Sequence, residues 1–127
     1  MIRCACLLET KGEQIMLVRV RNNALWYLPG GTIEAVETAE QALIREIDEE
    51  LGVAIDEQSM KFDRRIVGPA LGRDGDVELN CYRARWTGDI KPMAEISEVA
   101  FIGYQQTDKM APAIKILVDE MQRGQQS

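Results

Sequence analysis

The chain has 127 residues, a length typical of one domain, and its hydrophobic and charged fractions of 46% and 28% are those of an ordinary globular protein. A net charge of −6 argues against a protein that binds duplex nucleic acid through phosphate attraction, since such a protein carries a basic stripe. The chain contains no histidine, which excludes Ser-His-Asp and Cys-His catalysis and histidine-ligated zinc.

The N-terminal part of the chain predicts two strands and a turn. Residues 2–8 and residues 15–20 are strand-like apolar runs, and Lys11-Gly12-Glu13 supplies the turn between them. A short apolar segment at residues 25–28 then ends at Pro29-Gly30-Gly31, a combination that allows a tight turn and a close approach of backbone.

The strongest helix signal covers Ala39–Leu51. Thr38 is placed to cap its N-terminus, and Gln41, three residues later, completes a capping box. Gly52 stands where the C-terminus of a helix favours a residue with positive φ. Four apolar residues recur at every fourth position and are expected to face the core: Ala39, Leu43, Ile47 and Leu51.

The second half of the chain predicts a hairpin, a short strand and a final helix. The hairpin strands cover residues 61–71 and 76–87 and are joined by a loop at residues 72–76. The short strand covers residues 99–104, and the amphipathic helix covers residues 111–122. Strands therefore outnumber helices, which favours an α/β fold in which a mixed sheet lies between helices. We expect a single domain over residues 1–127.

The three cysteines favour a reducing compartment. Cys4 and Cys6 have the spacing of one face of a strand and not that of a redox or zinc pair, and Cys81 is distant in sequence. The sequence opens without the pattern of a signal peptide, and no apolar stretch reaches the ~18–20 residues that a membrane span needs. We therefore expect a cytoplasmic protein without a membrane partner.

The predicted helix at Ala39–Leu51 carries a concentration of acidic side chains. Glu46, Glu49 and Glu50 share one side near its C-terminal end, where carboxylates repel one another and oppose the helix dipole. Residues 37–50 hold six acidic residues and one base, Arg45. A hard divalent cation such as Mg²⁺, which prefers oxygen ligands, would compensate this charge. The alternative is a solvated acidic face with Arg45 and Glu49 as a surface pair.

The residues that follow the predicted turn match a family pattern. Gly31, Glu37 and the run Arg45-Glu46-Ile47-Asp48-Glu49-Glu50-Leu51-Gly52-Val53 agree with the Nudix box at every position. The chain therefore resembles the Nudix hydrolase family, and the segment Trp26-Tyr27-Leu28-Pro29 before the box is also similar to family members. The resemblance covers nearly the whole chain and implies an α/β/α sandwich with a mixed β-sheet.

The resemblance implies a hydrolase that cuts the pyrophosphate bond of a nucleoside diphosphate linked to another moiety, with Mg²⁺ or Mn²⁺ as cofactor. Glu37 resembles the box glutamate that binds a metal through water or steadies the loop. Arg45 resembles the residue that orients the carboxylates by pairing with Glu37 or Glu49. The metal ligands of the family fall on four residues here: the side chains of Glu46, Glu49 and Glu50, and the carbonyl of Gly30.

The general base and the substrate contacts have weaker signals. Family members draw the base from the box or from a later loop, and Glu95 and Glu98 precede the predicted strand at residues 99–104, with Glu95 slightly favoured. Ordinary surface carboxylates are the alternative. Arg19 and Arg21, at the end of the second strand, are candidates for phosphate contacts or solvated charges. Three aromatic residues are candidates for stacking on a base or for core packing: Trp26, Tyr82 and Trp86.

The box indicates the bond that is broken and not the group attached to it. The size resembles compact family members that cleave nucleoside triphosphates, normal or oxidised, to a monophosphate and pyrophosphate. Pro69 favours the alternative of an ADP-ribose or nucleotide-sugar pyrophosphatase, because ADP-ribose-cleaving relatives often carry a proline sixteen residues beyond the box. A second alternative is a non-catalytic nucleotide-binding module, which the intact box glutamates disfavour. The sequence leaves open whether the chain forms a homodimer, since it has no distinctive apolar stripe that would indicate an interface.

Overall fold

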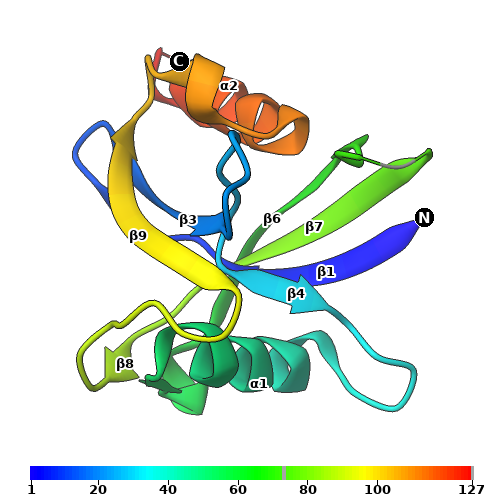
Figure 1. The fold of residues 1–127 in the computed structure, drawn as a ribbon, viewed down its shortest axis with the longest axis vertical. Coiled ribbons are helices and arrows are strands. Elements are labelled where there is room, and N and C mark those ends of the chain that lie inside the picture. Colours follow the sequence, from blue (N-terminus) through cyan, green and yellow to red (C-terminus); the bar gives the residue numbers. More distant parts are fainter. Residues whose placement is uncertain (73, 127) are drawn as a thin grey trace.

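The computed structural model of the chain describes residues 1–72 and 74–126, so Arg73 of the predicted loop lies outside the described residues. Two α-helices and nine strands are present in this part of the chain (Figure 1). The helices are α1 (Ala39–Leu51) and α2 (Pro112–Gln126), and two 3₁₀ turns cover Glu57–Ser59 and Thr107–Lys109. The strands are β1 (Ile2–Leu7), β2 (Thr10–Lys11), β3 (Gln14–Val20), β4 (Gly30–Thr32), β5 (Ala54–Ile55), β6 (Lys61–Pro69), β7 (Asp76–Arg83), β8 (Trp86–Thr87) and β9 (Ile96–Gly103).

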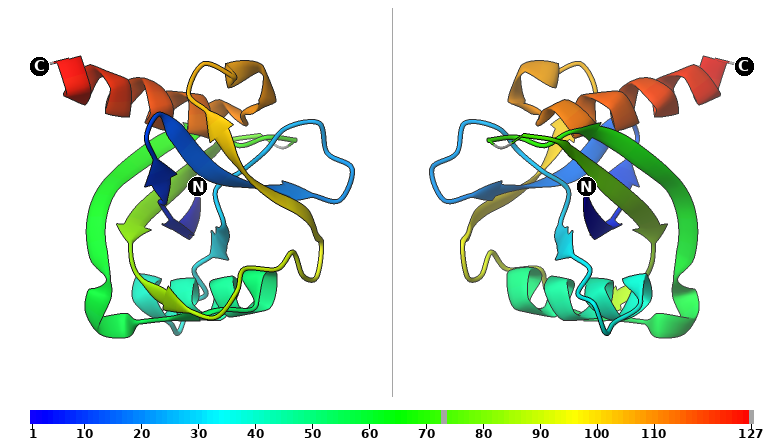
Figure 2. Two further views of the ribbon diagram at one scale, coloured as in Figure 1. Left: turned by 90° about the vertical axis from the view of Figure 1, so that its left-hand side faces the viewer. Right: turned by 90° about the vertical axis from the view of Figure 1, so that its right-hand side faces the viewer.

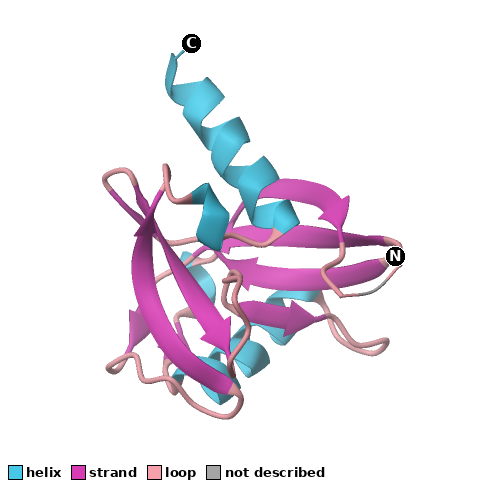
Figure 3. Ribbon diagram, turned by 45° about the horizontal axis from the view of Figure 1, so that its top comes forward, coloured by secondary structure: helices cyan, strands magenta, loops and turns pink. Residues whose placement is uncertain are grey.

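The strands form a mixed sheet and two smaller sheets. The larger sheet has the order β4-β1-β7-β6, in which β1 and β7 are parallel and the other pairs are antiparallel. A second sheet has the order β2-β3-β9, and β5 pairs with β8. Figure 1 shows α2 and α1 on opposite sides of these sheets, and Figure 3 shows the two larger sheets diverging from each other. The predicted α/β/α arrangement with a mixed sheet is confirmed.

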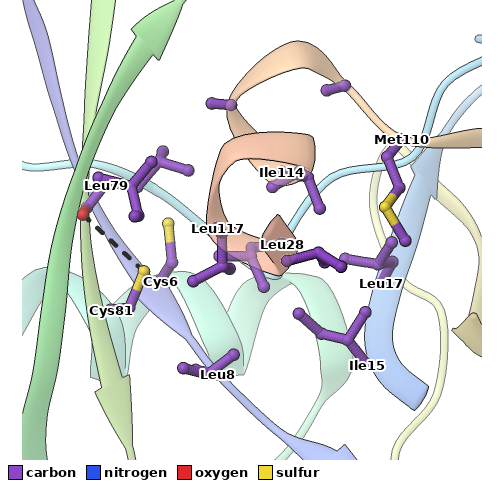
Figure 4. Packing of buried hydrophobic residues seen from close by; sticks show 14 of the residues in the cluster. Cys6, Leu8, Ile15, Leu17, Leu28, Leu79, Cys81, Met110, Ile114 and Leu117 are labelled. Carbon is purple, nitrogen blue, oxygen red and sulfur yellow. Dashed lines mark hydrogen bonds between the residues drawn. The ribbon is translucent and has the colours of Figure 1, made fainter. Parts of the chain in front are cut away.

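Two hydrophobic cores lie on the two faces of β1, because successive side chains of a strand point to opposite faces. Cys6 belongs to the core under α2, where it lies near Leu117 (Figure 4). Leu7 belongs to the core over α1, together with Leu43 and Ile47. The larger sheet is thus covered on both faces, which holds α1 in a fixed position against β1 and β4.

The prediction for α1 is confirmed at both ends. The Thr38 side chain accepts a hydrogen bond from the Gln41 N–H, and the Gln41 side chain accepts one from the Thr38 N–H. Gly52 has a φ of 68°, the left-handed conformation expected after a helix. Leu43, Ile47 and Leu51 are completely buried, whereas Ala39 is half-buried.

Other element boundaries differ from the predictions. The strand predicted at residues 99–104 begins at Ile96, because pairing with β3 extends it. The strand predicted at residues 76–87 is broken, since residues 86–87 leave β7 and pair with β5. The final helix continues to Gln126, and Figure 2 shows its C-terminal end projecting beyond the sheets. Within the described residues, neither helix has the length and apolar character needed to cross a bilayer.

Candidate active site

The site is built where α1 meets β4. Glu46 and Glu50 are one helical turn apart, and both point to this short strand. The N–H of Gly30 donates a hydrogen bond to Oε1 of Glu50 at 3.0 Å. A Cβ atom on Gly31 would lie only 2.5 Å from Cδ of Glu46, so the carboxylate occupies the space of a side chain. The two glycines therefore let the backbone come within reach of the helix, as the sequence predicts.

Gly30 also meets a steric requirement from the sheet. Its φ is 140°, and a Cβ atom there would lie 2.1 Å from the carbonyl oxygen of Ala5. The pairing of β4 with β1 therefore depends on a residue without a side chain at this position. The strand β4 was not predicted, because two successive glycines after a proline indicate a turn.

Arg45 connects the acidic side chains to the loop that precedes α1. Its Nε donates to Glu37 at 3.1 Å, Nη2 donates to the other oxygen of Glu37, and Nη1 donates to Glu46 at 2.7 Å. Glu49 is farther away, at 3.8 Å from Nη1. Glu37 also accepts the N–H of Glu34 at 2.9 Å, which fixes the loop. Of the two partners that the resemblance implies, Arg45 therefore hydrogen-bonds Glu37 and forms only a longer ion pair with Glu49.

Glu50 is the most perturbed carboxylate of this site. The side chain lies almost entirely inside the protein, since the residue is 7% exposed. Its pKa is raised to about 8, first by burial and then by the negative charges of Glu46, Glu95 and Glu49, against the lowering effect of the Gly30 N–H. The charges of three other carboxylates thus disfavour the ionised form of Glu50.

The acidic side chains of the described residues are not arranged around a single metal position. Within residues 1–72 and 74–126, no three carboxylates or thiols are spaced as a metal site. Arg45 instead neutralises Glu46 and Glu37, and the Gly30 N–H holds Glu50. The structure brings Glu46 and Glu50 of α1 against Gly30 and Gly31, and the role of the predicted ligands in binding a metal stays a prediction.

The two candidates for the general base lie in different environments. Glu95 precedes β9, and its charge acts on Glu50. Glu98 lies inside β9, so the prediction that it belongs to the preceding loop is wrong. Its carboxylate accepts a hydrogen bond from Nη1 of Arg19 at 3.0 Å, which is the ion pair expected of neighbours on paired strands. Glu98 is thus engaged by Arg19, whereas Glu95 lies in a turn that is bonded to the end of α1, since the N–H of Met93 donates to the carbonyl of Glu50 at 2.9 Å.

A cavity of about 340 Å³ opens next to the acidic side chains, on the α2 face of the larger sheet. Glu50, Gly30 and Gly31 line it, and so do Asn23 and Tyr27 from the segment before the box. Most of the remaining lining is apolar and comes from the sheet and α2: Ile2, Cys4, Cys6, Val77, Leu79, Ala113 and Ile114. A cavity of this size and composition is suited to a small organic ligand whose charged end reaches the carboxylates.

The predicted substrate contacts lie elsewhere. Trp26 is buried in the core under α2. Tyr82 is buried over α1, and its hydroxyl donates to Glu40 at 2.8 Å. Arg19 is engaged with Glu98, and Arg21 is exposed. None of these four residues is part of the cavity lining, nor is Trp86, which packs against the core over α1, so their contact with substrate stays a prediction.

Sequence reasoning missed two residues of the cavity. Tyr27 lies within the family-like segment before the box, so its position was a usable signal. Asn23 is one polar residue in a polar loop, and nothing local distinguishes it from its neighbour Asn22. Only the folded arrangement shows that Asn23 reaches the cavity.

The comparisons with known proteins agree on one family. A family model described as NUDIX domain matches residues 2–121. A Bacillus subtilis protein, provisionally named 8-oxo-dGTP diphosphatase, is 48% identical over 42 residues, which are 33% of this chain and 28% of that protein. A Mycobacterium tuberculosis protein, provisionally named 8-oxo-dGTP diphosphatase 2, is 40% identical over 63 residues, 50% of this chain and 43% of its own. The chain thus spans less than half the length of these curated relatives.

Solved structures show the same fold. The MutT protein of Methanosarcina mazei Go1 has a TM-score of 0.78 at 16% identity, over 99% of this chain and 96% of that one. The E. coli ORF135 protein has a TM-score of 0.74 at 22% identity, over 97% and 89% of the two chains. At these identities the likeness concerns the fold alone.

Proposed function

The chain belongs to the Nudix hydrolase family, and on this premise we propose that it is a metal-dependent pyrophosphohydrolase of nucleoside triphosphates. The products would be a nucleoside monophosphate and pyrophosphate, from a normal or an oxidised nucleotide. The observation that carries the proposal is the meeting of Glu46 and Glu50 with Gly30-Gly31 at the edge of the cavity. A nucleoside in the cavity would have its phosphates beside these carboxylates.

The residues of the site fit a hard divalent cation, Mg²⁺ or Mn²⁺. The donors are carboxylate and carbonyl oxygens, the ligands that these ions prefer. Burial and like charges disfavour the ionised form of Glu50, and a cation at this point would favour it. Glycine at positions 30 and 31 lets this backbone approach Ala5 and the Glu46 carboxylate without a side-chain clash. The proposed ligands are the side chains of Glu46, Glu49 and Glu50 and the carbonyl of Gly30, with Glu37 as a further ligand through water.

The proposed mechanism divides the work between the bound ion and the side chains. An ion held by Glu46, Glu49, Glu50 and the Gly30 carbonyl would neutralise phosphate oxygens and would lower the pKa of a water for in-line attack. Arg45 holds the Glu46 and Glu37 carboxylates in place through its hydrogen bonds, and does not contact substrate. Glu95 accepts the proton of the attacking water, since its turn is bonded to the end of α1 through the Met93 N–H and the carbonyl of Glu50. The apolar cavity holds the nucleoside and keeps bulk water from its base.

The choice of substrate rests on the relatives and the cavity together. Two relatives with names that refer to 8-oxo-dGTP favour a triphosphate. One observation favours the alternative substrates, ADP-ribose or a nucleotide sugar: Pro69, the residue that suggests them, lies in the cavity lining. Nucleosides of either substrate class would occupy the same cavity, so the class must be decided by turnover.

The test is product release from a panel of nucleotides with Mg²⁺ or Mn²⁺. The panel contains normal and oxidised nucleoside triphosphates, ADP-ribose and a nucleotide sugar. We expect pyrophosphate from a triphosphate, and a rate at least about 100-fold lower for Glu50→Gln. Glu57→Gln, an exposed carboxylate in a 3₁₀ turn, is the matched control and should keep the wild-type rate. Equal rates for wild type and Glu50→Gln would contradict catalysis at this site, and nucleotide binding without turnover would favour the binding module.

A further inference from the structure

Among the described residues, two that are not glycine adopt the left-handed backbone conformation. Arg21 has a φ of 51° and Ala94 a φ of 55°. An L-residue pays a conformational cost there, and such residues persist only where their surroundings hold them. The two segments meet, because the N–H of Arg21 donates to the carbonyl of Glu95 at 2.8 Å. The two strained residues thus lie on either side of Glu95, Ala94 before it in the chain and Arg21 bonded to its carbonyl.

Ala94 lies in a tight turn. The N–H of Ile96 donates to the carbonyl of Met93 at 3.0 Å and closes a four-residue turn in which Ala94 and Glu95 are central. A positive φ at the first central residue only is the type II′ pattern, which favours glycine at that position. The turn therefore carries alanine where glycine would be relaxed.

Further hydrogen bonds tie this turn and the residues next to it to their surroundings. The N–H of Met93 donates to the carbonyl of Glu50 at 2.9 Å, and the N–H of Lys91 donates to the carbonyl of Leu51 at 3.0 Å. On the other side, the Ser97 hydroxyl donates to the carbonyl of Arg21 at 2.6 Å. The segment that enters β9 in Figure 1 thus joins the last turn of α1 to the end of β3.

We propose that Ala94 is a positioning residue, whose left-handed conformation sets the tight turn that carries Glu95 against the last turn of α1, where the Met93 N–H is bonded to the carbonyl of Glu50. A methyl group at this position restricts the turn to fewer conformations than glycine allows. The backbone strain is the cost of that restriction. Arg21 restricts the turn further, because its N–H donates to the carbonyl of Glu95. The inference rests on the proposed function, because Glu95 needs to be held only if it accepts a proton there.

The test separates the effect on folding from the effect on catalysis. Ala94→Gly relieves the left-handed strain, so its Tm should stay the same or rise by up to about 4 °C. The same change loosens Glu95, so kcat should fall about three- to tenfold while KM changes less than about twofold, since neither residue lines the cavity. Ala94→Asn keeps a side chain that tolerates this conformation and should retain kcat within about twofold.

Two further variants complete the experiment. Glu95→Gln should lower kcat by about 100-fold, as expected for loss of a general base. Ala54→Gly, an exposed alanine in β5, is the control for added backbone freedom and should lower Tm while leaving kcat unchanged. A purely structural role for Ala94 predicts that Tm and kcat move together or that only Tm moves.

The outcomes distinguish this inference from the proposed function. A higher or equal Tm with a lower kcat for Ala94→Gly, and recovery with Ala94→Asn, supports positioning. Full kcat in Ala94→Gly, loss of kcat in Ala94→Asn, a lower Tm in Ala94→Gly, or full kcat in Glu95→Gln overturns it while the enzyme stays active. A wild-type chain that hydrolyses none of the nucleotides contradicts the proposed function itself.

Discussion

The carboxylate of Glu46 occupies the space where a side chain of residue 31 would be. Its Cδ lies 2.5 Å, and its oxygens 2.6 and 2.8 Å, from the position of a Cβ atom on Gly31. Because Arg45 also donates a hydrogen bond to Glu46 at 2.7 Å, a carboxylate displaced by an added methyl group would strain or lose this bond. Glycine at position 31 therefore serves the carboxylate and not the turn alone.

Gly31→Ala should displace Glu46 and lower kcat about 10- to 100-fold, because a misplacement of about 1 Å at a reacting centre costs activity of this order. The measurement is pyrophosphate release under saturating substrate. Gly124→Ala is the matched control, since a Cβ atom on this exposed α2 residue would meet no atom within 4 Å. That control should keep full activity and gain some stability from helix propensity. Full activity of Gly31→Ala would show that the position of Glu46 does not matter for turnover.

The local parts of this site were predictable from the sequence. The bounds of α1 follow from the capping box at Thr38 and from apolar residues spaced by one turn, and these signals lie within fourteen residues. The shared side of Glu46 and Glu50 follows from helix geometry alone. The proposed roles of these residues as metal ligands came from the family resemblance, because helix geometry alone does not assign a role.

The remaining parts depend on partners far away in the chain. Gly30-Gly31-Thr32 becomes a strand only because β1 offers a pairing edge to residues that have little strand propensity. Glu98 lies in β9 instead of a loop because Arg19 on β3 pairs with it across the sheet. The cavity joins β1, β7 and α2, so no local pattern could have shown that Asn23 reaches it and that Tyr82 does not.

A buried acidic group outside the site should make stability depend on pH. Glu78 is 5% exposed and accepts hydrogen bonds from Asn80 at 2.9 Å, Arg3 at 3.0 Å and Arg65 at 2.8 Å. These bonds lower its pKa from 4.5 to about 2. A lowered pKa in the folded state stabilises the protein above the unfolded value, and this contribution is lost as the pH falls from about 4.5 toward 2.

The measurement is the Tm of wild type and Glu78→Gln between pH 7 and pH 2. We expect wild type to be more stable at pH 7 and the difference between the two proteins to shrink below about pH 4.5. Glu57→Gln, with its exposed side chain, should follow wild type throughout. A difference that stays constant down to pH 2 would show that the charge of Glu78 contributes nothing.

Divalent metal should stabilise the folded chain through the α1 carboxylates. A ligand that binds only the folded state raises the free energy of unfolding by RT ln(1 + [L]/Kd), about 2.7 kcal/mol at 100 times Kd. We expect Mg²⁺ or Mn²⁺, with a non-hydrolysable nucleotide, to raise the Tm of wild type by several degrees, and much less for Glu50→Gln. Adding a chelator that removes Mg²⁺ and Mn²⁺ should abolish the Tm shift in both proteins. A shift of equal size in Glu50→Gln would place the metal elsewhere.

Asn23 and Asn22 offer a matched test of the cavity. Both are exposed residues of the loop after β3, but only Asn23 lines the cavity, where its carboxamide can donate to and accept from the edge of a base. Loss of one such contact, worth about 1.4 kcal/mol, corresponds to a tenfold change in affinity. Asn23→Ala should therefore raise KM about tenfold for the preferred triphosphate and leave kcat within about twofold, because the α1 carboxylates are untouched. Asn22→Ala should leave both constants unchanged, and an equal rise in KM for the two variants would mean that the base does not bind in this cavity.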